Sequence, residues 1–155
     1  MSVAFRREGD EEHLEPKFEI PIPPGPNRVT ARGLAQIGER VAELEAQVSQ
    51  GGDEARLKAL KRDLRYWQTR QVTAELAPVP TGETVEFGTT VTFRLGGKER
   101  VLSIVGDDEA DPSKGLISFS APLSRAMIGA EAGEMLPFGD KDDAIEVLSV
   151  VVSAG

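Results

Sequence analysis

Two stretches of apolar residues, spaced alternately by three and four positions, constrain the fold of this chain more than any other feature. The first stretch contains Leu34, Ile37, Val41, Leu44 and Val48. The second contains Leu57, Leu60, Leu64 and Trp67, followed by Gln71 and Ala74. Such spacing puts one narrow apolar seam on each of two helices, which is the pattern of a coiled coil. Because Gly51 and Gly52 separate the stretches, we predict that the helices fold back as an antiparallel hairpin.

Polar residues and prolines predict where these helices begin and end. Thr30 is a suitable N-cap for the first helix, which should run to about Ser49. Asp53 is a suitable N-cap for the second. The second helix should end near Leu76, because two prolines follow it and proline cannot continue a helix.

The residue pattern changes from helical to strand-like after these prolines. Residues 89–95 alternate and are rich in strand-forming residues, Gly96-Gly97 is a hairpin turn signal, and residues 100–105 form the returning strand. Further short strands are predicted at 116–119, 134–137 and 144–152, with a short helix at 121–128. The sequence therefore predicts an α+β fold, in which an antiparallel coiled-coil hairpin precedes a small antiparallel sheet with one short helix. The expected division is an extended or disordered arm at 1–28, the hairpin at 29–77 and the sheet domain at 78–155.

The predicted arm is rich in proline, which excludes helix and central strand. Two interpretations remain open for it. The arm is a solvated tail, or its apolar residues Phe18, Ile20 and Ile22 lie along a groove on this protein or on a partner.

Composition excludes several classes of function. The chain has 155 residues, no cysteine and one histidine, His13, which argues against disulfides, thiolate chemistry, a serine triad and a histidine zinc site. No apolar run is long enough to span a bilayer and no signal peptide is recognisable, so we expect a cytoplasmic protein without a membrane partner. A net charge of −8 argues against binding free nucleic acid. Residues 77–155 carry 13 acidic and 6 basic side chains, which suits a partner with a basic patch.

Several segments resemble one known family. Val105–Asp111, Leu116–Ser118 and Ser120–Gly129 resemble the C-terminal domain of the Gre transcript-cleavage factors (GreA/GreB). Phe87–Thr92 is similar to the entry strand of that domain. Val29–Leu34 and Leu64–Trp67 are similar to the start of the family's first helix and to its return helix. The resemblance runs in order through residues 29–152.

This resemblance implies a fold, a partner and a mode of action. The C-terminal domain is expected to be FKBP-like and to grip the rim of the secondary channel of bacterial RNA polymerase. The coiled coil is expected to enter that channel, where acidic tip residues of the family help to hold the polymerase's magnesium. A factor of this kind supplies ligands to another enzyme's site and is not itself an enzyme, so we expect no catalytic residue, no metal site and no cofactor of its own, apart from indirect contact with that magnesium.

The tip departs from the family pattern. Gly52-Asp53 matches, but Arg56 stands where the family has a glutamate, and Glu54 is the only neighbouring acid. The helices are also shorter than those of the cleavage factors, as in the Rnk-type polymerase-binding regulators. We therefore expect a non-catalytic regulator of transcription elongation that binds core RNA polymerase. Two alternatives remain: a true anti-backtracking factor that stimulates RNA cleavage, and an FKBP-like isomerase or chaperone module. The sequence does not indicate an oligomeric state.

Three groups of residues are candidate sites. The tip candidates are Asp53 and Glu54, which alternatively serve only as N-cap and helix-dipole partner. The basic face candidates of the second helix, alternatively an ordinary solvated face, are Arg56, Lys58, Lys61, Arg62 and Arg65, with Arg70 nearby. The polymerase-docking candidates are Asp107, Asp108, Glu109, Asp111, Ser120, Pro122 and Arg125. In this last group the acids alternatively bind calcium or order their own loop, while Ser120 caps and Pro122 starts the short helix.

Overall fold

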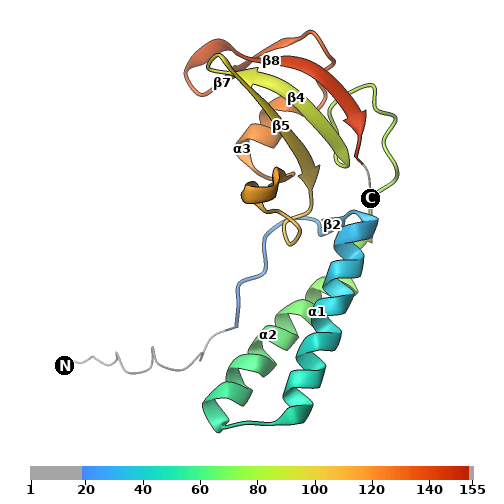
Figure 1. Ribbon diagram of the computed structural model, residues 1–155, viewed down its shortest axis with the longest axis vertical. Coiled ribbons are helices and arrows are strands. Elements are labelled where there is room, and N and C mark those ends of the chain that lie inside the picture. Colours follow the sequence, from blue (N-terminus) through green and yellow to red (C-terminus); the bar gives the residue numbers. More distant parts are fainter. Residues whose placement is uncertain (1–18, 154–155) are drawn as a thin grey trace, which may run out of the picture. The chain divides into compact units, whose positions relative to one another are not determined.

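The computed structural model describes residues 19–153, which divide into two units (Figure 1). The first unit contains Ala35–Thr73 together with the described residues up to Gly25. The second contains Pro26–Leu34 and the described chain from Ala74 onward. Most of the two long helices lie in the first unit, and all strands of the described chain lie in the second.

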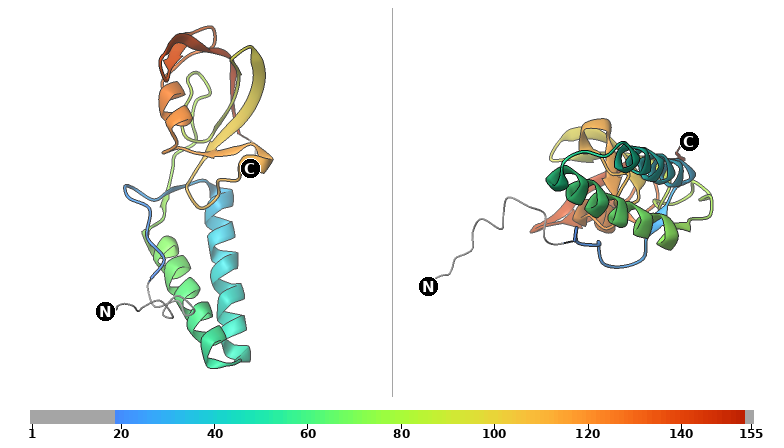
Figure 2. Two further views of the ribbon diagram at one scale, coloured as in Figure 1. Left: turned by 90° about the vertical axis from the view of Figure 1, so that its left-hand side faces the viewer. Right: turned by 90° about the horizontal axis from the view of Figure 1, so that it is seen from below.

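The two long helices form a hairpin. Helices α1 (Ala31–Gln50) and α2 (Glu54–Thr73) lie side by side and run in opposite directions (Figures 1 and 2). Gly51 and Gly52 in the turn have φ angles of 81° and 144°, a region that glycine adopts without steric cost. The predicted antiparallel hairpin is confirmed.

The apolar seam of the hairpin is more deeply buried on α1 than on α2. Ile37, Val41 and Leu44 of α1 are buried. The seam residues of α2 are half-buried: Leu57, Leu60, Leu64 and Trp67. Their burial explains why sequences with this spacing form paired helices, since most of a helix's stability comes from packing its apolar stripe.

Both predicted N-caps are present. The backbone N–H of Gly33 donates to Thr30 Oγ1 at 2.9 Å, and the backbone N–H of Arg56 donates to Asp53 Oδ1 at 2.8 Å. Each bond satisfies an amide in the first turn that has no partner within the helix.

The end of α2 differs from the sequence-based expectation. The helix ends at Thr73 rather than near Leu76. The chain leaves it early because strand β3 (Glu75–Leu76) pairs in parallel with strand β2 (Arg28–Val29), just before α1. Two backbone hydrogen bonds of 2.8 and 3.1 Å join these strands and their flanks. The strand pairing, and not the following prolines, therefore sets the end of the helix.

A five-stranded sheet dominates the second unit, with the strand order β6-β5-β4-β8-β7. Its strands are β4 (Thr89–Leu95), β5 (Lys98–Val105), β6 (Leu116–Ser118), β7 (Met135–Phe138) and β8 (Lys141–Val152). A 3-10 turn, η2 (Pro112–Lys114), lies between β5 and β6, and helix α3 (Pro122–Met127) lies between β6 and β7. The predicted hairpin at Gly96-Gly97 is confirmed, with both glycines at positive φ.

The sheet is mixed rather than wholly antiparallel. Strand β6 pairs with β5 in parallel, with Ser103 opposite Leu116. Residues 106–115 carry the chain back along β5, so that β6 runs in the same direction as β5. The other pairs, β4 with β5 and with β8, and β7 with β8, are antiparallel.

One apolar core joins the sheet to α3. The buried members of this core are Val85, Phe87, Val91, Phe93, Leu102, Ile104, Met127, Ala130, Ile145 and Val147. Met127 comes from α3, and alternate residues of β4 supply Val91 and Phe93, as expected for a strand with one buried face. The α+β class is confirmed, whereas the FKBP-like identity of this unit stays a prediction. Within residues 19–153, no helix has the length and apolar character that crossing a membrane requires.

Candidate functional site

The tip of the hairpin presents one acid that is already used for capping. Asp53 is exposed, and its Oδ1 accepts the amide of Arg56. The side chain of Arg56 folds over the turn, since its Cδ lies 2.8 Å from the place where a Cβ on Gly52 would stand. Glu54 is exposed beside it in the first turn of α2. The tip therefore combines two acids with an arginine, and nowhere among residues 19–153 do three or more potential metal-ligating side chains converge.

The basic face of α2 is mostly solvated. Four of its five members are exposed, namely Arg56, Lys58, Lys61 and Arg65, and Arg62 is half-buried with hydrogen bonds to Asp63. The neighbouring Arg70 differs, because only 1% of its surface is exposed. Arg70 is therefore not part of a solvated basic face, which corrects the interpretation from sequence.

The second unit brings one docking acid and one docking serine together. Asp107 Oδ1 accepts hydrogen bonds from the hydroxyls of Ser118 and Ser120, the latter at 2.9 Å. The predicted capping role of Ser120 is wrong: Ala121 occupies the N-cap position of α3 and makes no side-chain cap bond. The serine hydroxyl is instead drawn to a carboxylate, which is the stronger acceptor. Pro122 begins α3 and is exposed, as predicted.

Among the remaining docking candidates, Asp111 orders its own loop and Arg125 is an exposed arginine. Asp111 accepts the backbone N–H and the hydroxyl of Ser113, and these bonds hold the pKa of Asp111 below its ordinary value. This behaviour fits the interpretation that the acidic loop orders its own backbone. Arg125 on α3 is exposed and makes no ion pair with any side chain of residues 19–153. Asp108 is half-buried in the same loop as Asp107.

Glu109 is more deeply buried than the other docking candidates. Only 8% of its surface is exposed, and the hydroxyl of Thr30 donates to its Oε1 at 2.6 Å. That oxygen lies 2.8 Å from the position of a Cβ on Gly33, so the carboxylate covers the first turn of α1, where a negative charge is favoured. This second role of Thr30 was not visible in the sequence, because the two residues are 79 positions apart.

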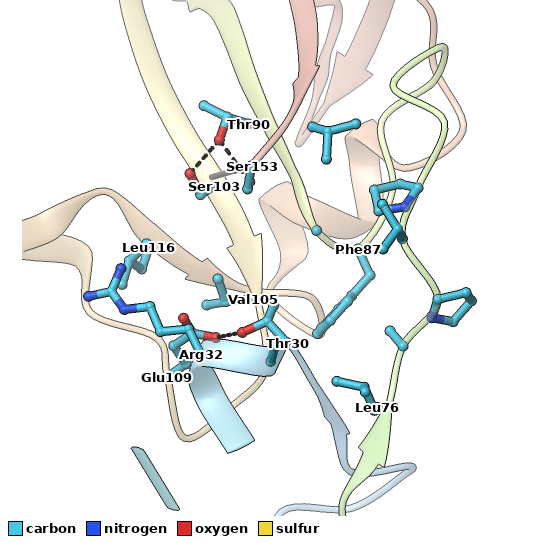
Figure 3. A pocket seen from close by; sticks show the side chains of 17 residues that line it. Thr30, Arg32, Leu76, Phe87, Thr90, Ser103, Val105, Glu109, Leu116 and Ser153 are labelled. Atoms are coloured by element: carbon cyan, nitrogen blue, oxygen red, sulfur yellow. Dashed lines mark hydrogen bonds between the residues drawn. The ribbon is translucent and has the colours of Figure 1, made fainter. Parts of the chain in front are cut away.

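A cavity of about 410 Å³ lies within the second unit and was not predicted (Figure 3). Its walls include Leu76, Phe87, Val105 and Leu116, and its polar groups include the pair of Thr30 and Glu109. At another side of the cavity the hydroxyl of Thr90 shares hydrogen bonds with those of Ser103 (2.7 Å) and Ser153 (2.8 Å), as Figure 3 shows. Its lining residues come from segments far apart in the chain, so no local motif in the sequence predicts the cavity.

The cavity does not resemble the aromatic cup that a proline isomerase needs. Phe87 is the one aromatic residue among its lining residues. Phe93 is fully buried in the core, while Phe119 and Phe138 pack against that core. The phenylalanines of the second unit are therefore used for packing.

Comparisons with known proteins assign the family. Residues 80–151 match the family described as "Transcription elongation factor, GreA/GreB, C-term". A transcription elongation factor GreA of Thioalkalivibrio sulfidiphilus is 36% identical over 127 residues, which cover 78% of this chain and 78% of that protein. The chain belongs to the GreA/GreB family. GreA of Pseudomonas aeruginosa is also 36% identical to this family member, over 124 residues that cover 76% of each chain. The solved GreA/GreB structure from Nitrosomonas europaea covers 83% of this chain and 99% of its own, at 18% identity and a TM-score of 0.38.

Membership in the GreA/GreB family makes this chain a relative of transcription elongation factors, whose partner at the level of the family is RNA polymerase. The docking candidates between Asp107 and Arg125 lie within the matched residues 80–151. The tip and the basic face precede that match and lie on the hairpin.

Proposed function

We propose that this GreA/GreB-family chain is a non-catalytic regulator of transcription elongation that acts at the secondary channel of RNA polymerase. In this proposal the half-buried Asp107 and the exposed Ser120, Pro122 and Arg125 contact the rim of the channel. The helical hairpin is presented to the channel and affects pausing, elongation or the access of other factors.

One observation carries the non-catalytic part of the proposal: the composition of the tip. A carboxylate that coordinates magnesium must approach the ion to about 2 Å. Asp53 already uses one oxygen to accept the Arg56 amide, and the cationic side chain of Arg56 folds over the same turn, where it opposes a second cation. Position 56 also holds an arginine, where the family's tip pattern has a glutamate.

A second candidate function is favoured by the exposed carboxylate of Asp53. Its Oδ2 is not part of the cap bond, so a cleavage-stimulating factor with a single tip acid remains a distinct hypothesis. The experiment that separates the two uses backtracked elongation complexes and measures factor-dependent RNA cleavage.

We expect the unmodified protein to bind core polymerase and to produce no cleavage above the polymerase's intrinsic rate. Asp53→Asn and Asp53→Ala are the informative variants, because asparagine keeps the N-cap acceptor while alanine removes it at a cost of about 1 kcal/mol of helix stability. Strong cleavage by the unmodified protein that both variants lose would replace our proposal by the second candidate. Loss in Asp53→Ala alone would show that the cap, and not the charge, matters.

The proposed docking surface leads to a separate prediction for Arg125. Because Arg125 is exposed and makes no ion pair among the described residues, Arg125→Ala should leave the melting temperature unchanged. Arginine is a frequent hot-spot residue in interfaces, so we expect the affinity for core polymerase to fall about tenfold. Fluorescence anisotropy with labelled protein measures the affinity of the unmodified protein and of the Arg125→Ala variant for core polymerase.

Arg100→Ala is the matched control, since Arg100 is an exposed arginine of the same unit outside the docking candidates. Equal affinities for the Arg125→Ala and Arg100→Ala variants would remove α3 from the proposed docking surface.

A further inference from the structure

A short segment of the chain's own N-terminal arm binds the outer surface of α2. Arg65 holds Glu19 with two parallel hydrogen bonds, from Nε to Oε1 and from Nη2 to Oε2, each 2.7 Å long. This two-pronged geometry is the strongest form of contact between arginine and a carboxylate. The hydrogen bonds from Arg65 hold the pKa of Glu19 below its ordinary value, so the pair is charged at neutral pH.

Two isoleucines extend this contact. Ile20 and Ile22 line a shallow depression on the first unit, whose other walls come from α2 and include Tyr66, Thr69 and Val72. Pro21 keeps the arm extended between the isoleucines, and residues two apart on an extended chain point to the same side. The groove interpretation of the arm is therefore supported for Ile20 and Ile22, while Phe18 lies outside the described residues.

The contact between the arm and α2 is weak enough to be reversible. The side chains of Glu19 and Arg65 remain 62% and 54% exposed, and an ion pair so exposed is weak in water. Val72 is 82% exposed beside the isoleucines, so the arm covers only part of the apolar surface there. Because the arm is tethered, even a weak contact competes with a free partner at an effective concentration on the order of millimolar.

The arm also covers a residue of the basic face. Arg65 is one of the basic face candidates, and as an exposed cation it suits an acidic partner surface. In the free protein a carboxylate of this chain already neutralises it. The arm thus presents one acid, Glu19, followed by the branched apolar side chains of Ile20 and Ile22, and a partner segment with the same chemistry would compete for the same surface of α2.

We propose that residues Glu19–Ile22 act as an internal competitor, which occupies the surface of α2 around Arg65, Tyr66 and Val72 and must leave before an acidic and apolar partner segment binds there. This inference rests on the proposed function, because the partner is a surface of RNA polymerase. Release of the arm then becomes a step that precedes or accompanies engagement of the hairpin.

Glu19→Lys tests the competition without altering α2. Reversing this charge opposes Arg65 and should release the arm, so we expect affinity for core polymerase to rise about three- to tenfold. Glu83→Lys is the matched control, since it changes the net charge equally at an exposed glutamate of the second unit. We expect its affinity to stay near that of the unmodified protein. A gain in both variants would indicate a general charge effect and would overturn the competition.

Arm release is measured independently in the free protein. Tyr66 is the only tyrosine of the chain, so nuclear Overhauser contacts between the isoleucine methyls and a tyrosine ring are assigned without ambiguity. These contacts should be present in the unmodified protein, absent in Glu19→Lys and restored when Glu19→Lys is combined with Arg65→Glu. Their absence from the unmodified protein would overturn the inference.

The outcomes for polymerase separate the inference from the proposed function. If the unmodified protein and Glu19→Lys bind core polymerase equally well, the competition is wrong and the proposed function stands. If neither protein binds core polymerase, the proposed function fails and the competition fails with it.

Discussion

Replacing Leu44 by alanine is expected to lower the free energy of unfolding of the helical hairpin by about 2–5 kcal/mol. Leu44 has no exposed surface and belongs to the apolar seam of α1. Truncation removes buried apolar atoms and leaves a cavity that two short helices cannot fully close. Urea unfolding followed by the emission of Trp67, the only tryptophan and a residue of α2, measures the change.

Glu45→Ala is the control for this prediction, because Glu45 is the exposed neighbour of Leu44 on the same helix. Its effect should stay within about 0.5 kcal/mol. An equally small effect of Leu44→Ala would mean that the seam is not what holds α1 and α2 together, and the hairpin on which the proposed function depends would need another explanation.

Gly106→Ala is expected to destabilise the second unit by about 1–3 kcal/mol. A Cβ at this position would lie 2.3 Å from the carbonyl oxygen of Arg28, which belongs to strand β2. Backbone cannot yield as the end of a flexible side chain can, so the loop and β2 must separate. The φ angle of Gly106 is outside the positive region, and the penalty is therefore one of space alone. Thermal unfolding followed by circular dichroism measures it.

Gly38→Ala provides a matched comparison with the opposite sign. Gly38 lies inside α1, and a Cβ at this position would have Gln71 Nε2 as its nearest atom, at an ordinary contact distance of 3.6 Å. Alanine is the better helix former, so this change should stabilise the hairpin by up to about 1 kcal/mol. If Gly106→Ala proved as harmless as Gly38→Ala, the close approach of the loop to β2 would be refuted.

Local signals explain why much of the architecture was predictable. The 3-4 apolar spacing, Thr30, Asp53 and the glycine turn each act within a few residues, and each indicated the correct helix or cap. The β4–β5 hairpin followed in the same way from Gly96-Gly97. Such signals depend on propensity and hydrogen bonding between near neighbours, which a single sequence displays directly.

Contacts between distant segments explain the errors. The end of α2 depends on pairing of β3 with β2, and the direction of β6 depends on the path of the preceding loop. Ser120 was expected to cap α3. Its actual partner, Asp107, is 13 residues away, so no local pattern indicated that bond. The cavity, the bond between Thr30 and Glu109, and the placement of the arm on α2 likewise join segments that no local pattern connects. The candidate sites could be named from sequence, but which of their members are exposed could not.

The parallel pair of β2 and β3 has a consequence for how this architecture can vary. Everything from α1 to α2 is, in topological terms, an insertion between two hydrogen-bonded strands. Whole turns added to or removed from both helices in step would move the tip by about 5.4 Å per turn and leave every backbone bond of the strand pair in place. The length of the hairpin can thus change in evolution, and the distance that it reaches changes with it, while the pairing of β2 with β3 stays the same.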